Sequence, residues 1–399
     1  MREITHDKKR GNRNRNLVLS VPLRIILNGA GVSFFISHKR LLHAFETADG
    51  VRQFGFHLEQ TRFAWLKKLL IKGYIEKIEI QVRNITAHRL HLEDAVKMAF
   101  FSMFRRRINL SILECMYDSS MLRSWNRTHP KKSIGPSVRI AEKSIRELLN
   151  ARAPGACAEI KAEIYNRIMQ RLPSSTPDIR EDSRWIRNFI RELIGELNPL
   201  IFFVLIGSKR DERFALMRNL TDKVMEFMNC LDVLNLSSLL AIELVSAAER
   251  STLVKFLNDT GDIRGILESP EQRQSIMEAR HFRGSTVVIA VPGEVPPEKQ
   301  RLRFRLSVYN DGADVEAERK LMEDVSERSC GFMAGQHLED FFKTPPAKRG
   351  LDVYEDNGLC FYYLTVLQDQ CRKNNIILDS HIKKSHSGKS VVTTLRFGF

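Results

Sequence analysis

Short alternating patterns of apolar and polar residues predict several strands in the first third of the chain. Between Ile75 and Val82, apolar positions are separated by Glu, Lys and Gln, which is typical of a half-buried strand. We expect strands at Asn16–Leu27, Gly31–Ile36, Val51–Leu58 and Tyr74–Val82, and helices at His38–Glu46 and Thr61–Lys72. The pattern predicts a small mixed α/β domain over residues 15–135, after a basic, disordered arm over residues 1–14.

Residues 136–232 are dense in helix signals. We expect helices at Ser137–Asn150, Ala158–Arg171, Glu181–Leu197 and Lys209–Asn229, after an earlier one at His91–Phe104. Proline-rich turns separate them, and Pro199–Gly207 is interpreted as a further break. These amphipathic segments need a partner face, so the region predicts a helical bundle that docks on the last domain or dimerises through it.

Strand-like runs return near the C-terminus. They are expected at Thr286–Val291, Arg301–Val308 and Val391–Phe399, with a helix at Phe361–Cys371 and a short apolar run at Ile376–Leu378. In residues 301–308, leucine, phenylalanine and valine alternate with arginine. This alternation predicts a sheet with its helices on one side and a basic open side.

One predicted helix, Leu236–Leu257, carries a carboxylate on its apolar face. At helical spacing the face consists of Leu236, Leu240, Glu243, Ala247 and Val254. A buried carboxylate is costly unless it is paired. Two interpretations stay open: Glu243 reaches solvent or a basic neighbour at the edge of the face, or it has a functional role.

The order of these elements resembles the ATP-binding domain of histidine kinases, which belongs to the GHKL superfamily with DNA gyrase B, MutL and the ninety-kilodalton heat-shock chaperones. The resemblance covers residues 233–399. It implies an α+β fold whose C-terminal part is a two-layer α/β sandwich of the histidine-kinase ATPase type. The central helical bundle and the N-terminal mixed α/β domain match no family.

The family's helix motif is Glu-x-x-x-Asn, in which the glutamate is the general base and the asparagine holds Mg²⁺. The resemblance puts Glu243 at the general-base position and Ala247 where the asparagine belongs. A methyl group cannot ligate magnesium, which prefers oxygen ligands. We therefore expect no metal site at this helix.

Two further motifs of the family are kept in part. Asn310, Gly312 and Asp314 stand where Asp-x-Gly-x-Gly is expected, and Gly358-Leu359-Cys360 stands where Gly-x-Gly is expected. The resemblance implies that Asn310, Gly312, Gly358 and Leu359 form the nucleotide-binding site. Because each motif has lost a glycine that lets the backbone approach phosphates, we expect weak binding of ATP, with or without Mg²⁺.

The composition of the chain indicates a cellular compartment and a further possible class of function. The net charge is +15 and the six cysteines form no C-x-x-C pair, which indicates reduced thiols in a cytoplasmic protein. The longest fully apolar run, Leu200–Ile206, is too short to span a membrane. Residues 105–139 are basic and include Tyr117 and Trp125, so nucleic-acid binding is one alternative and an ordinary solvated surface is another.

Three functions remain open from the sequence. The first is a cytoplasmic signalling or regulatory protein with a degenerate ATP-binding domain, without phosphotransfer, that acts through protein partners, a second copy among them. The second is an active sensor histidine kinase or ATPase, although no histidine occurs between His129 and His281 to accept a phosphoryl group. The third is a basic nucleic-acid-binding protein.

Overall fold

The fold is taken from a computed structural model of the 399-residue chain. It describes residues 18–135, 142–152, 155–172, 187, 189–257, 269–278, 284–292, 302–310, 359–384 and 390–399. The described residues divide into two compact units, one of residues 1–103 and 232–399 and one of residues 104–231. Each unit is described by itself.

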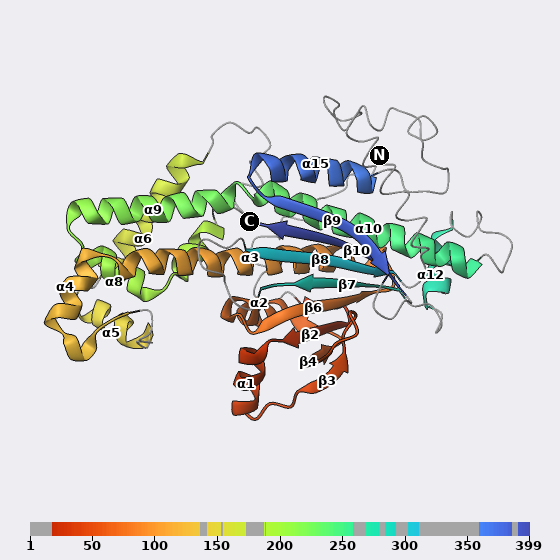
Figure 1. The fold of residues 1–399 in the computed structure, drawn as a ribbon, viewed down its shortest axis with the longest axis horizontal. Coiled ribbons are helices and arrows are strands. Elements are labelled where there is room, and N and C mark those ends of the chain that lie inside the picture. Colours follow the sequence, from red (N-terminus) through yellow and green to blue (C-terminus); the bar gives the residue numbers. More distant parts are fainter. Residues whose placement is uncertain are drawn as a thin grey trace, which may run out of the picture. The chain divides into compact units, whose positions relative to one another are not determined.

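An eight-stranded antiparallel sheet forms the centre of the first unit (Figure 1). Its order is β3-β4-β2-β6-β7-β8-β10-β9. The strands are β2 (Leu23–Leu27), β3 (His43–Glu46), β4 (Arg52–Leu58), β6 (Ile75–Val82), β7 (Ser285–Ala290), β8 (Arg303–Asn310), β9 (Ile377–Lys384) and β10 (Val391–Gly398). Strands β1 (Val18–Leu19) and β5 (Thr61–Arg62) form a separate two-stranded pair.

Strand β6 joins the two ends of the chain into one sheet. It pairs with β2 on one side and with β7 on the other, so that Ile78 is opposite both Ile25 and Ile289. The boundaries of the compact units therefore differ from the domains expected at 15–135 and 233–399, because the strands of both segments share one set of backbone hydrogen bonds. Pairing between strands 200 residues apart leaves no local pattern in the sequence.

Apolar side chains cover one face of the sheet. Phe304, Leu306 and Val308 are buried, whereas Arg303 is exposed and Arg305 is half-buried on the other face. The alternation expected for residues 301–308 is thus confirmed over residues 302–306, whereas Ser307 is also buried and Arg301 lies outside the described residues. Helix α3 (Ile85–Tyr117) passes behind the sheet in Figure 1, and its Phe100 ring packs edge-on against Phe304 at 5.5 Å.

Besides α3 up to residue 103, the described residues of the first unit form further helices. They are α1 (Gly29–Ser37), α2 (Phe63–Lys72), α12 (Pro270–Glu278) and α15 (Leu359–Lys373), and α10 (Leu231–Leu257) also lies in this unit from residue 232 on. Helix α2 ends at Gly73, whose φ of 72° lies in the left-handed region that glycine adopts without strain.

Two expectations for residues 31–46 were wrong. Residues Gly31–Ile36, expected as a strand, lie within α1, because the Asn28 side chain accepts a hydrogen bond from the Gly31 N–H and caps the helix. Residues His38–Glu46, expected as a helix, form a loop and the edge strand β3. The cap outweighed the local β propensity of the apolar run.

The second unit is helical. After the C-terminal part of α3 it contains α4 (Ser120–Thr128), a short 3₁₀ turn (Pro130–Lys132), α5 (Glu142–Arg152), α6 (Ala156–Arg171), α8 (Pro199–Gly207) and α9 (Arg210–Met228). Segment Pro199–Gly207, expected as a break, is instead a buried helix that begins with an Asn198 cap and Pro199 in its first turn. The antiparallel sheet of the first unit and the helices of both units confirm a mixed α+β fold.

Candidate functional site

Two of the residues that the sequence assigned to a nucleotide site, Glu243 and Asn310, lie on α10 and at the end of β8. On α10, Glu243 and Ala247 are half-buried. The fully buried side of the helix carries Ala241, Val245 and Ala248 instead. Glu243 therefore lies at the edge of the packed face. This position agrees with the interpretation that Glu243 is an edge residue of the apolar face.

Asn310 is the last residue of β8 and is only 3% exposed. Its side-chain oxygen Oδ1 accepts a hydrogen bond from the Thr252 hydroxyl on α10 at 3.0 Å. Two segments that the sequence grouped into one site are thus adjacent in the structure. The side-chain oxygen that would accept a hydrogen bond from an adenine amino group already accepts one from Thr252.

The structure says less about the other residues that the sequence assigned to the nucleotide site. Gly312 and Gly358 lie outside the described residues. Leu359 is the first residue of α15. At the magnesium position Ala247 supplies no oxygen, and within the described ranges no three His, Cys, Asp or Glu side chains converge to hold a metal ion. The residues present do not fit a bound Mg²⁺ ion at α10.

Sequence reasoning missed the buried carboxylate of this helix, Glu249. It is 4% exposed and accepts a hydrogen bond from the Ile85 N–H at the start of α3, at 2.7 Å. Helix N-termini carry unpaired N–H groups and a partial positive charge, so a carboxylate there is stabilised. The signal in the sequence was available, since residue 249 follows Val245 by one helical turn on the buried face.

A second polar cluster, which the sequence analysis did not single out, lies on the open face of the sheet. The Lys77 ammonium, 6% exposed, forms an ion pair with Asp49 at 2.6 Å and donates to the Gln53 side chain at 3.2 Å. Arg305 of β8 lies 3.9 Å from the same Asp49 carboxylate. These contacts hold the β3–β4 turn over the sheet.

The titration of this cluster reflects its partial burial. Burial opposes ionisation of Asp49, but hydrogen bonds from Lys77 and Thr47 and the nearby positive charges lower its pKa below the ordinary value. Burial raises the pKa of Tyr309, beside Asp49 and Arg305, to about 12. Asp49 is therefore ionised and Tyr309 protonated at neutral pH.

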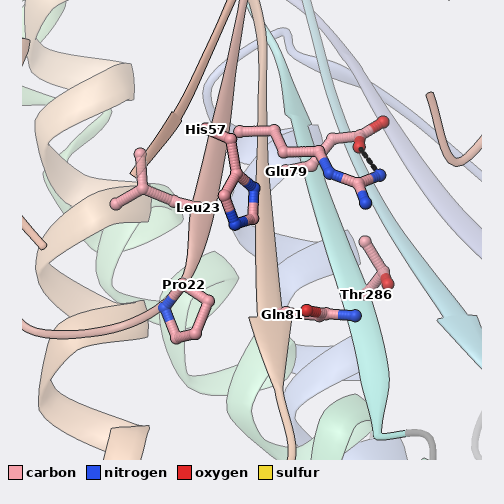
Figure 2. Close-up of a pocket in the computed structure, with 7 residues that line it drawn as sticks. Pro22, Leu23, His57, Glu79, Gln81 and Thr286 are labelled. Atoms are coloured by element: carbon pink, nitrogen blue, oxygen red, sulfur yellow. Dashed lines mark ion pairs between the residues drawn. The ribbon is translucent and has the colours of Figure 1, made fainter. Parts of the chain in front are cut away.

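A pocket opens beside this cluster (Figure 2). It encloses about 240 Å³, including the solvent at its mouth. Residues of β4, β2, β6 and β7 line it, together with the residue that precedes β2: Pro22, Leu23, Arg24, His57, Glu79, Gln81 and Thr286. Arg24 faces His57 on one neighbouring strand and Glu79 on the other, so their side chains share one face of the sheet.

Glu79 is the most buried ionisable group of the pocket. It is 2% exposed, and its Oε1 accepts from the Ala48 N–H at 2.7 Å. Its Oε2 has no hydrogen-bond partner among the described residues and lies 3.7 Å from the Arg24 guanidinium, the ion pair that is dashed in Figure 2. Burial raises the pKa of Glu79 above its ordinary value, against the hydrogen bond from Ala48 and the charge of Arg24.

Two residues of the basic segment 105–139, Arg105 and Trp125, make contacts within the second unit. Arg105 pairs with Glu196, and burial lowers the pKa of Arg105 to about 10. The Trp125 ring stacks on His129 at 3.9 Å, and its N–H donates to the Lys132 carbonyl at 3.2 Å. These contacts assign Trp125 to the packing of the turn after α4, which argues against a base-stacking platform there.

Among the described helices, the stretch Arg210–Arg250 is long and apolar enough to cross a membrane by length and composition. Its most apolar window is 56% buried within the structure. Buried helices of globular proteins meet the same criterion, so this is weak evidence for a membrane span.

Comparison with known proteins gives a family. Residues 14–399 match the model of a family of unknown function, DUF8084. The chain belongs to this family. It is 20% identical to an uncharacterized protein of Treponema pallidum (strain Nichols) over 396 residues, 97% of this chain and 100% of that protein. No solved structure matches this DUF8084 member.

Proposed function

We propose that the first unit of this DUF8084 protein is a degenerate ATP-binding domain of the histidine-kinase type, and that the protein has a signalling or regulatory role in the cytoplasm. In this proposal it transfers no phosphoryl group and acts through protein partners, a second copy of the chain among them. Glu243, Asn310, Gly312, Gly358 and Leu359 are remnants of the nucleotide pocket.

The observation that carries the proposal is the contact between α10 and the end of β8. In the resemblance, the helix motif and the motif after the second strand belong to one site, although 67 residues separate Glu243 from Asn310 in the chain. The hydrogen bond from Thr252 to Asn310 supports this arrangement. The order of the elements also supports it: α10 is followed, after the short helix α12, by the β7–β8 pair, α15 and the β9–β10 pair.

The departures from the family support a loss of catalysis. Ala247 offers no ligand to the Mg²⁺ that would bridge the phosphates. Asn310 is 3% exposed and already accepts from Thr252. A nucleotide would therefore bind weakly and without dependence on magnesium.

Calorimetric titration of the full chain with ATP and with ADP, each with and without Mg²⁺, tests the proposal. We expect dissociation constants of about 1 mM or weaker that do not change with magnesium. Magnesium-dependent binding near 1 μM, about a thousandfold tighter, would contradict it. That result would favour an active ATP-dependent sensor kinase or ATPase in which another group replaces the missing asparagine.

A further inference from the structure

The pocket beside Glu79 is independent of the proposed nucleotide site. It is formed by strands β2, β4, β6 and β7, whereas the proposed nucleotide site involves α10, the end of β8 and the start of α15. The two sites share no residue. The inference below therefore stands whether or not the protein binds ATP.

The pocket contains an acceptor oxygen that lacks a donor. Glu79 is 98% removed from solvent, yet its Oε2 has no hydrogen-bond partner among the described residues while Oε1 is satisfied by Ala48. A buried carboxylate oxygen without a donor destabilises a fold, so its retention beside a cavity calls for an explanation. A ligand that donates an N–H hydrogen bond to Oε2 would offset the free-energy cost of burying this oxygen without a donor.

The Arg24 guanidinium lies beside the same Glu79 oxygen. Arg24 is 39% exposed, lies 3.7 Å from Glu79 Oε2, and donates one hydrogen bond to the Glu46 carbonyl at 3.3 Å. Its remaining N–H groups are available to an anionic oxygen. The pocket thus presents a cation and an anion side by side, which is the charge pattern complementary to a zwitterion.

We propose that this pocket binds a small free amino acid, with the ammonium group on Glu79 Oε2 and the carboxylate on the Arg24 guanidinium. A ligand with a single charge would face a like charge within the 3.7 Å that separates the two side chains. The Thr286 hydroxyl and the Gln81 amide at the rim supply neutral donors and acceptors for the same ligand.

The size of the pocket restricts the side chain. The space of about 240 Å³ includes the open solvent at the mouth, so the room inside the pocket is smaller than this volume. Glycine, alanine and serine fit this limit better than aromatic or long-chain amino acids. The ligand class is therefore small zwitterionic amino acids.

Ligand-detected NMR with the full-length protein tests the proposal. Glycine, alanine and serine are titrated one at a time, with acetate and methylamine as probes that carry only one of the two charges. We expect saturable binding of at least one amino acid below about 10 mM and binding of both single-charge probes at least about tenfold weaker. Equal binding of acetate or methylamine would overturn the zwitterion assignment.

Two pocket variants and two control variants locate the site. Glu79→Gln and Arg24→Met should each weaken amino-acid binding at least about tenfold. Glu114→Gln and Arg123→Met remove the same charges from exposed positions in the second unit and should leave binding unchanged. Circular dichroism shows whether each variant is folded, and either folded pocket variant suffices for the comparison.

Two results would overturn the proposal. One is the absence of binding of all three amino acids to the wild-type protein at concentrations up to about 10 mM. The other is unchanged binding in a folded Glu79→Gln or Arg24→Met variant, which would place the ligand elsewhere on the chain.

Discussion

The carboxylate of Glu249 on α10 accepts a hydrogen bond from the backbone N–H of Ile85, the first residue of α3, at 2.7 Å. The two residues are 164 positions apart in the chain, and both are buried. A negative charge at the N-terminus of a buried helix complements the helix dipole. This contact ties the start of α3 to the helix on which the proposed nucleotide site is built.

The contact predicts unequal effects of two alanine substitutions on the same helix. Glu249→Ala leaves the Ile85 N–H buried without its acceptor and should lower the free energy of unfolding by about 1–3 kcal/mol. Glu243→Ala, at a half-buried position, should cost less. Urea unfolding followed by circular dichroism measures both. Equal losses would show that Glu249 has no special role.

Because Asp49 and Lys77 form an ion pair, substitutions of the two residues should have non-additive effects on stability. Lys77 is 6% exposed and is held by Asp49 and Gln53, so Lys77→Met should destabilise the fold by about 2 kcal/mol by leaving the Asp49 carboxylate underpaired. Asp49→Asn and the double variant complete a thermodynamic cycle. We expect a coupling free energy of about 1 kcal/mol or more, and additive losses would contradict the assignment.

The two carboxylates of the cluster predict opposite pH dependences. The pKa of Asp49 is lowered in the fold from its ordinary value of 3.8, so the stability that its ionisation contributes is present above that pH and is lost as the pH falls through the folded-state pKa. The destabilisation caused by Asp49→Asn should therefore shrink in acid. The free energy of unfolding of the wild type and of the variant is measured from pH 3 to pH 7. A difference between the two that stays constant over this range would contradict the prediction.

The ionisation of Glu79 changes the stability of the fold with pH in the direction opposite to that of Asp49. Burial raises its pKa above the ordinary value of 4.5, so the folded protein binds the proton more tightly and wild-type stability falls as the pH rises through that range. Glu79→Gln removes this ionisation. Relative to the wild type, the variant should become progressively more stable from pH 4 to pH 7, and a difference in stability that does not change with pH would contradict the assignment.

The cysteines are predicted to differ in reactivity. Burial raises the pKa of the Cys230 thiol to about 11, so little of it is thiolate at neutral pH. Cys115 and Cys157 are half-buried. Alkylation of the native protein followed by peptide mass spectrometry should label Cys157 well before Cys230. Faster labelling of Cys230 would indicate that its surroundings open readily.

The local elements of the sheet could be predicted from the sequence, and their partners could not. The strands at Val51–Leu58, Tyr74–Val82 and Thr286–Val291 were predicted because alternation depends only on neighbouring residues. The pairing of β6 with β7 depends on contacts across 200 residues, and the insertion of β10 between β8 and β9 depends on the whole sheet. Neither leaves a local pattern.

The candidate sites likewise combine features that could be predicted from the local sequence with features that could not. The basic face of β8 follows from periodicity, whereas periodicity alone left both interpretations of Glu243 open. The pocket beside Glu79 could not be predicted, because it depends on the lateral alignment of Arg24 with both His57 and Glu79 in three strands. In a single strand Glu79 resembles any solvent-facing glutamate, and only the assembled sheet buries it.

Restoration of the lost nucleotide-binding residues tests the central claim most directly. The variant Ala247→Asn/Asp314→Gly/Cys360→Gly supplies a magnesium ligand and two glycines at the positions that the resemblance assigns to them. Calorimetry should show that its affinity for ATP is at least about tenfold higher than that of the wild type and depends on Mg²⁺. A folded triple variant with unchanged ATP affinity would contradict the assignment of these motifs to a nucleotide site.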